Sequence, residues 1–223
     1  MDFDFLASTE LFRGVSVEEV RKVLSCLAAR ERSYFKGDII YSTGDTVKEI
    51  GLVEEGSVNV VVNFLWGDSN IFGHVEKGEV FAETYAAVTD KPLLCDVVAA
   101  ENCRILFVDM SRLLTTCRNG CEYHNAIIHN IVAISAAKNL GLSSRMMHIA
   151  SKSIRGRLLS YLNEQSIENG SRYFTIPFSR QQLADYLNVD RSALSNELSK
   201  MQKDGLIDFH RSDFYIKEGG FVG

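Results

Sequence analysis

The residues best suited to chemistry with another molecule lie near the C-terminus, in residues 179–203. In the second half of this segment Leu194, Leu198 and Met201 follow the i, i+4, i+7 spacing of a buried helical stripe, and polar side chains occupy the positions between them. Hydroxyl, amide and guanidinium groups form hydrogen bonds with base edges in the major groove of DNA. The residues predicted to contact DNA are Ser179, Arg180, Arg191, Ser192, Ser195, Asn196, Lys200 and Arg211.

Two helices and a turn must hold these side chains. Ser179 and Asp190 are predicted N-caps. Ala184 is small where the two helices approach closely, and Asn188 tolerates the left-handed conformation that the turn requires. A hairpin is predicted over residues 208–216, with the Arg and Ser of positions 211 and 212 at its tip. The alternative is an ordinary helical hairpin with a solvated polar face. The order of the features, with the caps, the small residue, the turn residue and the following hairpin, favours a winged helix-turn-helix.

The segment Ser-Arg-Gln-Gln-Leu-Ala-Asp-Tyr-Leu…Arg-Ser-Ala-Leu-Ser…Leu resembles the Crp–Fnr family of bacterial transcription regulators. Phe35-Lys36-Gly37-Asp38, Gly44-Asp45 and Glu55-Gly56-Ser57-Val58 resemble the early turns of the family's barrel, so that the resemblance covers nearly the whole chain. It implies a homodimer that binds a palindromic operator in double-stranded DNA and acts on RNA polymerase.

By position, the resemblance implies that Arg180 contacts a backbone phosphate and that Arg191, Ser192 and Asn196 face the bases. The family often has Glu where Ser192 stands and Arg where Asn196 stands. Because Asn favours adenine and Arg favours guanine, the family's commonest operator is not expected here.

The first half of the chain has the pattern of a β-barrel. Residues 8–30 are predicted as a helix in which Ser16 and Glu19 form a capping box. From about Ser33 the apolar residues alternate with polar ones, in short runs separated by glycine turns that continue to about residue 109. Short strands at regular spacing indicate a barrel or jelly roll.

A proline-free stretch from Glu122 to Met147 predicts one helix about 39 Å long. Its isoleucine-rich stripe, which includes Ile131, is expected to be the seam of a homodimer; a helix packed only on its own barrel is the alternative. The predicted fold class is therefore α+β. It comprises a double-stranded β-helix (jelly-roll) sensor in residues 1–110, a dimerisation helix and linker in 111–148, and a winged helix-turn-helix in 149–223.

Cyclic-nucleotide-binding members of the family hold the ribose with a Gly-Glu pair and the phosphate with an Arg-Ser pair. Here Ala82 stands in place of the glycine, Glu83 is retained, and Leu93 and Leu94 stand where the Arg-Ser pair would be. A phosphate against two leucines would lose its charge-assisted hydrogen bonds, so that cyclic AMP is not the expected effector. A cavity filled by side chains, with no effector, is the alternative. The candidate effector-lining residues are Glu83, Tyr85, Leu94, Ile127 and Ile128.

Composition limits the other classes of function. The net charge is −5, yet residues 149–223 hold ten Lys and Arg against nine Asp and Glu, so that a DNA-binding face depends on where the charges lie.

The sequence has five cysteines, an odd number, and no C-x-x-C pair, which predicts reduced thiols. Cys117 and Cys121 are four residues apart and are expected to be small buried residues, with a redox pair as the alternative.

No catalytic, metal or cofactor motif is present, and neither haem nor an iron–sulfur cluster is expected. The sequence shows no signal peptide and no apolar run long enough to span a membrane, so that a cytoplasmic protein without membrane contact is expected. Two hypotheses remain for the function. The first is a DNA-binding regulator controlled by a small molecule, or independent of one. The second is a ligand-binding module that acts through a protein partner.

Overall fold

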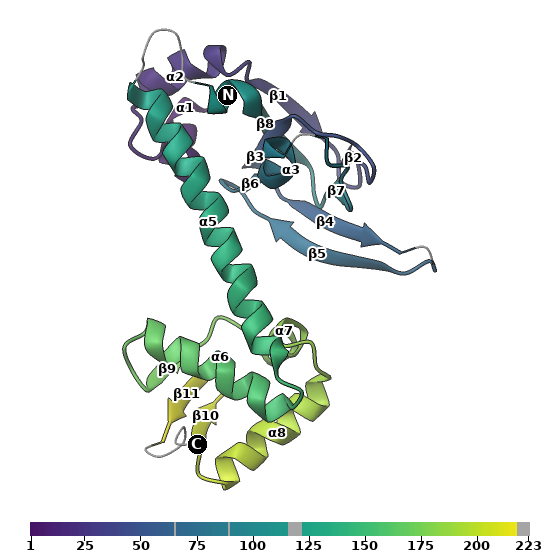
Figure 1. Cartoon of the computed structure of the whole chain (residues 1–223), viewed down its shortest axis with the longest axis vertical. Helices are drawn as coiled ribbons and strands as arrows, with labels where there is room; N and C mark the ends of the chain where they lie inside the picture. Colours follow the sequence, from purple (N-terminus) through teal and green to yellow (C-terminus); the bar gives the residue numbers. More distant parts are fainter. Residues whose placement is uncertain (65, 89, 116–121, 218–223) are drawn as a thin grey trace. The chain divides into compact units, whose positions relative to one another are not determined.

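The computed structural model describes residues 1–223 except 65, 89, 116–121 and 218–223. It divides into two compact units, residues 1–137 and residues 138–223. The longest helix, α5, spans Glu122–Ala150, three residues beyond its predicted end, and therefore contributes residues to both units (Figure 1). The predicted boundaries at residues 110 and 148 differ from this division because the first half of α5 packs into the core of the first unit.

Two antiparallel four-stranded sheets form the barrel of the first unit (Figure 1). One has the strand order β1-β8-β3-β6 and the other has the order β2-β7-β4-β5, so that the predicted jelly-roll sensor is confirmed. The strands are β1 (Arg30–Tyr34), β2 (Ile39–Tyr41), β3 (Glu49–Glu55), β4 (Val58–Asn63), β5 (Ser69–Val75), β6 (Val80–Phe81), β7 (Asp96–Ala99) and β8 (Cys103–Asp109).

Aromatic rings pack against one another between the two sheets. Tyr41 lies edge-to-face against Phe81 and Phe107, with centroid distances of 6.2 and 5.9 Å, and Tyr34 meets Phe107 in the same way at 6.4 Å. A Cβ at Gly51 would lie 2.1 Å from the ring of Phe81, so that this strand position requires glycine. Side chains of the protein itself thus pack against one another in this part of the barrel interior, as side chains in protein cores generally do.

A second core lies between the β1-β8-β3-β6 sheet and the helices. On β8, Ile105 and Phe107 face the barrel interior, whereas Leu106 and Val108 face the helices, because successive strand residues point to opposite sides. Ile131 of α5 joins this helical core. The short helices that pack here are α1 (Phe3–Ser8), η1 (Glu10–Phe12), α2 (Val17–Cys26), α3 (Glu83–Ala87) and α4 (Met110–Leu114).

The single helix predicted over residues 8–30 is wrong, although the capping box between Ser16 and Glu19 is confirmed. Gly14 has a φ of +79° and Ala28 a φ of +50°, and these left-handed residues break the chain on either side of α2. The next strand, β1, already begins at Arg30.

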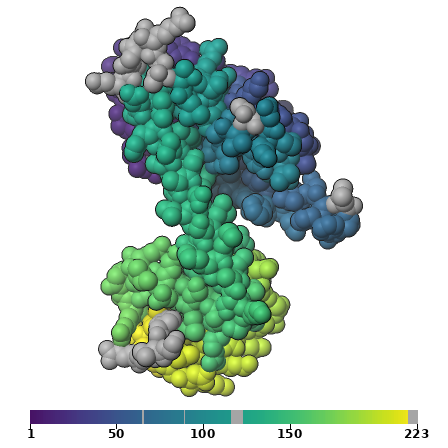
Figure 2. Space-filling view, in the orientation of Figure 1, coloured from purple at the N-terminus to yellow at the C-terminus, as the bar shows by residue number. Residues whose placement is uncertain are grey.

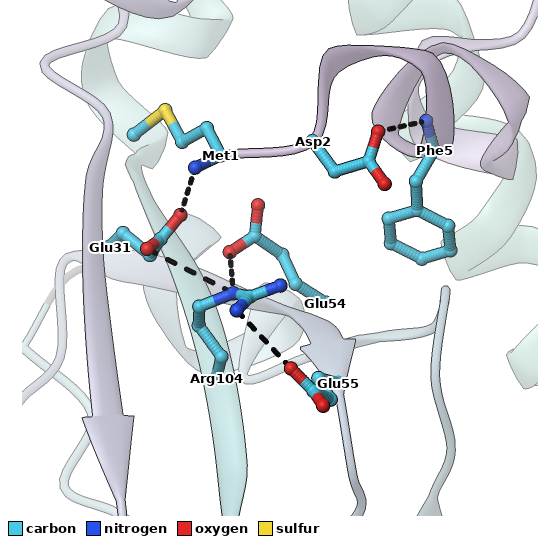
Figure 3. A network of polar contacts seen from close by, with 7 residues as sticks. All are labelled: Met1, Asp2, Phe5, Glu31, Glu54, Glu55 and Arg104. Carbon is cyan, nitrogen blue, oxygen red and sulfur yellow. Dashed lines mark hydrogen bonds and ion pairs between the residues drawn. The ribbon is translucent and has the colours of Figure 1, made fainter.

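Arg104 on β8 lies at the centre of a charge cluster in the first unit (Figure 3). Its Nε lies 3.3 Å from Oε2 of Glu54, and its Nη1 lies 3.2 Å from Oε2 of Glu55. Glu31 lies between Arg104 and the Met1 amino nitrogen, at 3.9 and 2.8 Å. The Glu54 side chain is fully buried. Burial, and then the neighbouring Glu31 carboxyl group, raise the pKa of Glu54 to about 7.

The second unit is a winged helix. Its helices α6, α7 and α8 enclose one apolar core with the three-stranded sheet β10-β11-β9, and the predicted winged helix-turn-helix is thus confirmed. The elements are α6 (Ile154–Glu168), β9 (Tyr173–Thr175), α7 (Arg180–Tyr186), α8 (Arg191–Lys203), β10 (Ile207–His210) and β11 (Asp213–Ile216). Among the described residues, no helix combines the length and the apolar character that a membrane span requires.

Candidate DNA-binding interface and effector site

Side-chain caps define the two helices of the helix-turn-helix as the sequence predicts. The Ser179 hydroxyl accepts a hydrogen bond from the Gln182 backbone N–H (3.3 Å), and the Gln182 side chain accepts one from the Ser179 N–H (2.8 Å). Asn188 has a φ of +52° in the turn. Asp190 accepts from the N–H groups of Ser192 and Ala193, each at 2.9 Å, and starts α8. The Ser192 hydroxyl and these backbone groups lower the pKa of Asp190.

One face of α8 is anchored and the other is exposed. Leu194, Leu198 and Met201 are fully buried, as predicted. The exposed face of α8 presents Arg191, Ser192, Asn196, Ser199 and Lys200, while Ser195 is half-buried.

Hydrogen bonds within the protein separate the candidate base-reading residues into two groups. The hydroxyl of Ser192 donates to Asp190, and the hydroxyl of Ser195 donates to the Arg191 carbonyl at 3.0 Å. In the described part of the chain, the side chains of Arg191 and Asn196 make no hydrogen bond or ion pair. Their donors and acceptors are therefore available for base edges.

An ion-pair bridge that the sequence analysis missed holds α8 against α6. The Nε of Arg155 lies 2.6 Å from Oε1 of Glu197, and its Nη2 lies 2.7 Å from Oδ2 of Asp204. Arg155 thus contacts both the middle and the C-terminal end of α8. The only sequence signal is opposite charge, which does not identify partners 42 and 49 residues apart.

Arg180 has a second role besides the predicted phosphate contact. Its guanidinium lies over the rings of Phe209 and Phe214, 5.1 and 5.5 Å from their centroids, and donates a hydrogen bond to the Arg211 carbonyl (2.8 Å). Burial lowers its pKa. Arg180 therefore connects the start of α7 to the tip of the wing, where Arg211 is exposed and has a φ of +53°.

The candidate effector-lining residues lie in different environments. Glu83 is buried and Tyr85 half-buried on the short helix α3. Leu94 is 72% exposed, whereas its neighbour Leu93 is buried. Ile127 is fully buried, and Ile128 is partly buried beside it, in the core that α5 forms with the N-terminal helices. The five side chains thus lie in different environments, and their role as an effector lining stays a prediction.

Ala82 occupies a position whose backbone suits glycine. It has a φ of +63° and precedes α3 as its N-cap residue, without a side-chain cap hydrogen bond. A left-handed conformation costs an L-residue roughly 1–2 kcal/mol, which glycine avoids. Ala82 thus has a backbone conformation that glycine would adopt without this cost.

The described cysteines differ in exposure, and none of them forms a disulfide. Cys26 is exposed, Cys95 half-buried and Cys103 buried, and all three thiols are unbridged. The predicted pair Cys117 and Cys121 lies outside the described residues. Within the described ranges, no three His, Cys, Asp or Glu side chains are grouped to hold a metal ion. Whether the protein has a cofactor stays a prediction.

Two family models match the chain, one on each side of α5. The cyclic nucleotide-binding domain model matches residues 31–119, and the Crp-like helix-turn-helix domain model matches residues 156–218. No curated protein matches the sequence.

Solved structures share this fold over nearly the whole chain. The catabolite activator protein of Thermus thermophilus is 22% identical, with 94% of each chain covered and a TM-score of 0.50. CprK in complex with OCPA is 16% identical, over 89% of this chain and 91% of CprK, with a TM-score of 0.63. The global regulator CLP of Xanthomonas campestris is 17% identical, over 90% of this chain and 99% of CLP, with a TM-score of 0.55. These structures share the fold of the chain. The two domain models, which together match more than half of the sequence, show that the chain belongs to the Crp–Fnr family of DNA-binding transcription regulators.

Proposed function

We propose that the protein is a homodimer that reads a palindromic DNA operator and is controlled by a small molecule other than cyclic AMP. The observation that carries the DNA-reading part is the exposed face of α8, where the side chains of Arg191 and Asn196 make no hydrogen bond to the described residues of the protein. Lys200 on the same helix and Arg211 on the wing add positive charge that suits phosphates.

The dimer is proposed to form along the exposed face of α5. Ala133, Leu140 and Met147 recur every seven residues, and Ala136 and Ser143 form a second row with the same spacing. All five are exposed in the single chain, and Figure 2 shows much of α5 uncovered on the face in view. Two rows at heptad spacing are the pattern of a coiled-coil seam, and the small residues allow two helices to approach closely.

This seam differs from the one that the isoleucine stripe predicts. Ile127 and Ile131 are 0% and 2% exposed, because they already pack on the N-terminal helices of their own chain. The apolar residues available to a second copy are those on the other side of the helix, above all Leu140, which is 70% exposed.

The aromatic packing of the barrel supports an effector without a phosphate. A ligand between the sheets would have to pack against or displace Tyr41, Phe81 and Phe107. Such an environment favours an apolar or aromatic molecule and disfavours a charged one. Relatives of this fold carry different effectors: CprK is complexed with OCPA, and CLP is responsive to c-di-GMP. The same packing also suits a regulator that needs no effector, and this is the second candidate.

Other parts of the function rest on the family alone. A contact with RNA polymerase, a cytoplasmic location and the absence of enzymatic activity remain proposals. Action through a protein partner is disfavoured because the exposed face of α8 carries no Trp, Tyr or Phe, the side chains that commonly anchor protein interfaces.

Selection of DNA fragments bound by the purified full chain, with and without a small-molecule extract, tests this proposal. We expect an enriched palindrome whose half-sites are about 34 Å apart, with enrichment that depends on the extract. Enrichment that is equal in both samples would favour the effector-independent candidate. No enrichment in either sample, or a single unpaired half-site, would contradict the proposal.

A further inference from the structure

The last turns of α5 hold the C-terminal end of α7, the first helix of the helix-turn-helix. Arg145 donates hydrogen bonds to the carbonyls of Tyr186 (3.1 Å) and Asp185 (3.4 Å). Its guanidinium also lies 5.5 Å from the centre of the Tyr186 ring. Carbonyls at the end of a helix carry partial negative charge, so that an arginine there is favourable.

His148, one turn of α5 further on, makes a second connection to the same residue. The imidazole is 2% exposed; its Nδ1 lies 3.0 Å from the Tyr186 hydroxyl and its Nε2 lies 2.8 Å from Oε2 of Glu164 on α6. The ring of Tyr161 packs edge-on against it at 5.5 Å, and Ser144 donates to the other oxygen of Glu164. A buried side chain with hydrogen bonds at both ends has one orientation, which makes this connection rigid.

Another arginine holds the neighbouring carbonyls, but from a different helix. Arg157 of α6 donates to the carbonyls of Leu187 (2.9 Å) and Asn188 (2.8 Å), and also to Ser151 (2.9 Å). Arg157 thus joins the turn to Ser151, the residue after α5, whereas Arg145 and His148 are part of α5 itself and attach the winged helix to it. Arg145 and Arg157 both donate to carbonyls near this turn, but only Arg145 is part of α5. Substitutions of the two arginines can therefore be compared.

We propose that Arg145, His148 and Tyr186 form a latch of positioning residues that fixes the winged helix on its segment of α5 and so sets the spacing between the two operator half-sites. The inference rests on the proposed homodimer along α5. In such a dimer the position of each recognition helix relative to the twofold axis depends on how its winged helix is attached to α5. Once one recognition helix has bound its half-site, the second helix can bind the other half-site of the same DNA without a new encounter. With a rigid attachment this is possible at one spacing only.

The test compares the full-length wild type with the double variant Arg145→Met/Tyr186→Phe, which removes the guanidinium and one hydroxyl group but keeps the apolar bulk and the ring. Affinity is measured for the selected palindrome, for palindromes with one or two base pairs added or removed at the centre, and for a single half-site. We expect the wild type to lose about tenfold or more at each altered spacing, and the variant to differ by less than about threefold, with the half-site affinity unchanged. A spacing profile equal to that of the wild type would overturn the latch.

Arg157→Met is the control. It should weaken the half-site and the full site alike and keep the wild-type spacing profile; if it flattens the profile as strongly as the double variant does, the latch has no special role.

Hydrogen exchange of the full chain without DNA gives an independent measurement. The double variant should exchange faster in residues 138–150 but not in α8, and unchanged exchange there would overturn the latch. If the wild type is monomeric, or if its affinity does not depend on half-site spacing, the proposed function is refuted instead. The hydrogen-exchange result then still decides whether the latch holds α5.

Discussion

At the scale of single residues, base reading depends on which polar groups the protein itself leaves unused. On α8 the hydroxyl of Ser195 donates to its own helix, and the hydroxyl of Ser192 donates to the N-cap Asp190. Arg191 and Asn196 are exposed without such bonds in the described chain. Sequence specificity should therefore come mainly from these two side chains.

Asn196→Ala tests this directly. An Asn side chain that pairs with adenine contributes about 1–3 kcal/mol of discrimination, so that its removal should flatten base preference at one symmetric pair of operator positions. Non-specific binding should persist. The measurement is selection of binding sites from random DNA, with Ser199→Ala as the control, because that hydroxyl also donates to its own helix. An unchanged selected motif would mean that α8 is not oriented as proposed.

Arg180→Ala should affect all DNA sequences equally. The change removes the predicted phosphate contact, so that the slope of affinity against salt should decrease by about one unit. It also removes the stacking on Phe209 and Phe214 and the bond to the wing carbonyl, which should lower stability by about 1–2 kcal/mol. Salt titration and urea unfolding separate the two effects. Lower stability with an unchanged salt slope would leave Arg180 with only its role in holding the wing.

Glu54→Gln should change how stability depends on pH. The pKa of Glu54 in the folded protein, about 7, lies above its ordinary value of 4.5, so that folding favours the protonated carboxyl group. That contribution is present below about pH 4.5 and is lost as the pH rises through 7. Gln does not titrate, and the variant should be about 1–3 kcal/mol more stable than the wild type at pH 8 but not at pH 5.

Urea unfolding at the two pH values measures this difference in stability. Glu55→Gln is the control, because that side chain contacts the same guanidinium but is 65% exposed. If the two variants show the same pH dependence, burial of Glu54 is not the cause.

At the scale of elements, α5 presents different faces to its own chain and to solvent. Ile131 is part of the core that the helix shares with α1, η1 and α2, whereas Leu140 and Leu142 are both exposed. Only Leu140 shares the heptad row of Ala133 and Met147. An added charge should therefore have a different effect at each of the three positions Ile131, Leu140 and Leu142.

Leu140→Asp should yield monomers with weak operator binding, because it places a charge in the proposed seam. Leu142→Asp should remain dimeric. Ile131→Asp should instead destabilise the first unit by more than about 3 kcal/mol, because it buries a charge in a packed core. Sedimentation velocity and thermal unfolding measure the two outcomes. If Leu140→Asp remains dimeric and Leu142→Asp does not, the seam lies on another face.

At the scale of the whole molecule, the sensor has the fold of a cyclic nucleotide-binding domain, and we propose that it lacks the phosphate clamp of that domain. Leu93 is buried and Leu94 is exposed at the positions that the family resemblance assigns to the clamp, and aromatic rings pack inside the barrel. Isothermal titration of the full chain with cyclic AMP should therefore show no binding up to about 1 mM. Micromolar affinity would contradict this assignment of the pocket.

The sequence by itself determined the fold class, the order of the domains and the local structure of the helix-turn-helix. Its caps, the left-handed Asn188 and the buried stripe of α8 are confirmed, because each depends on residues a few positions apart. The period-two pattern identified the barrel for the same reason. The break of the predicted 8–30 helix is the exception, since single left-handed residues such as Ala28 leave no periodic signal.

Only the tertiary structure decided which apolar and charged residues meet. The isoleucines of α5 form a stripe in the sequence, but whether a stripe faces its own chain or a second copy depends on the surface brought against it, here the N-terminal helices. The aromatic core of the barrel, the Arg155 bridge and the attachment of Tyr186 to Arg145 and His148 join residues distant in sequence. Such contacts follow from packing and hydrogen-bond geometry in three dimensions, which local spacing does not encode.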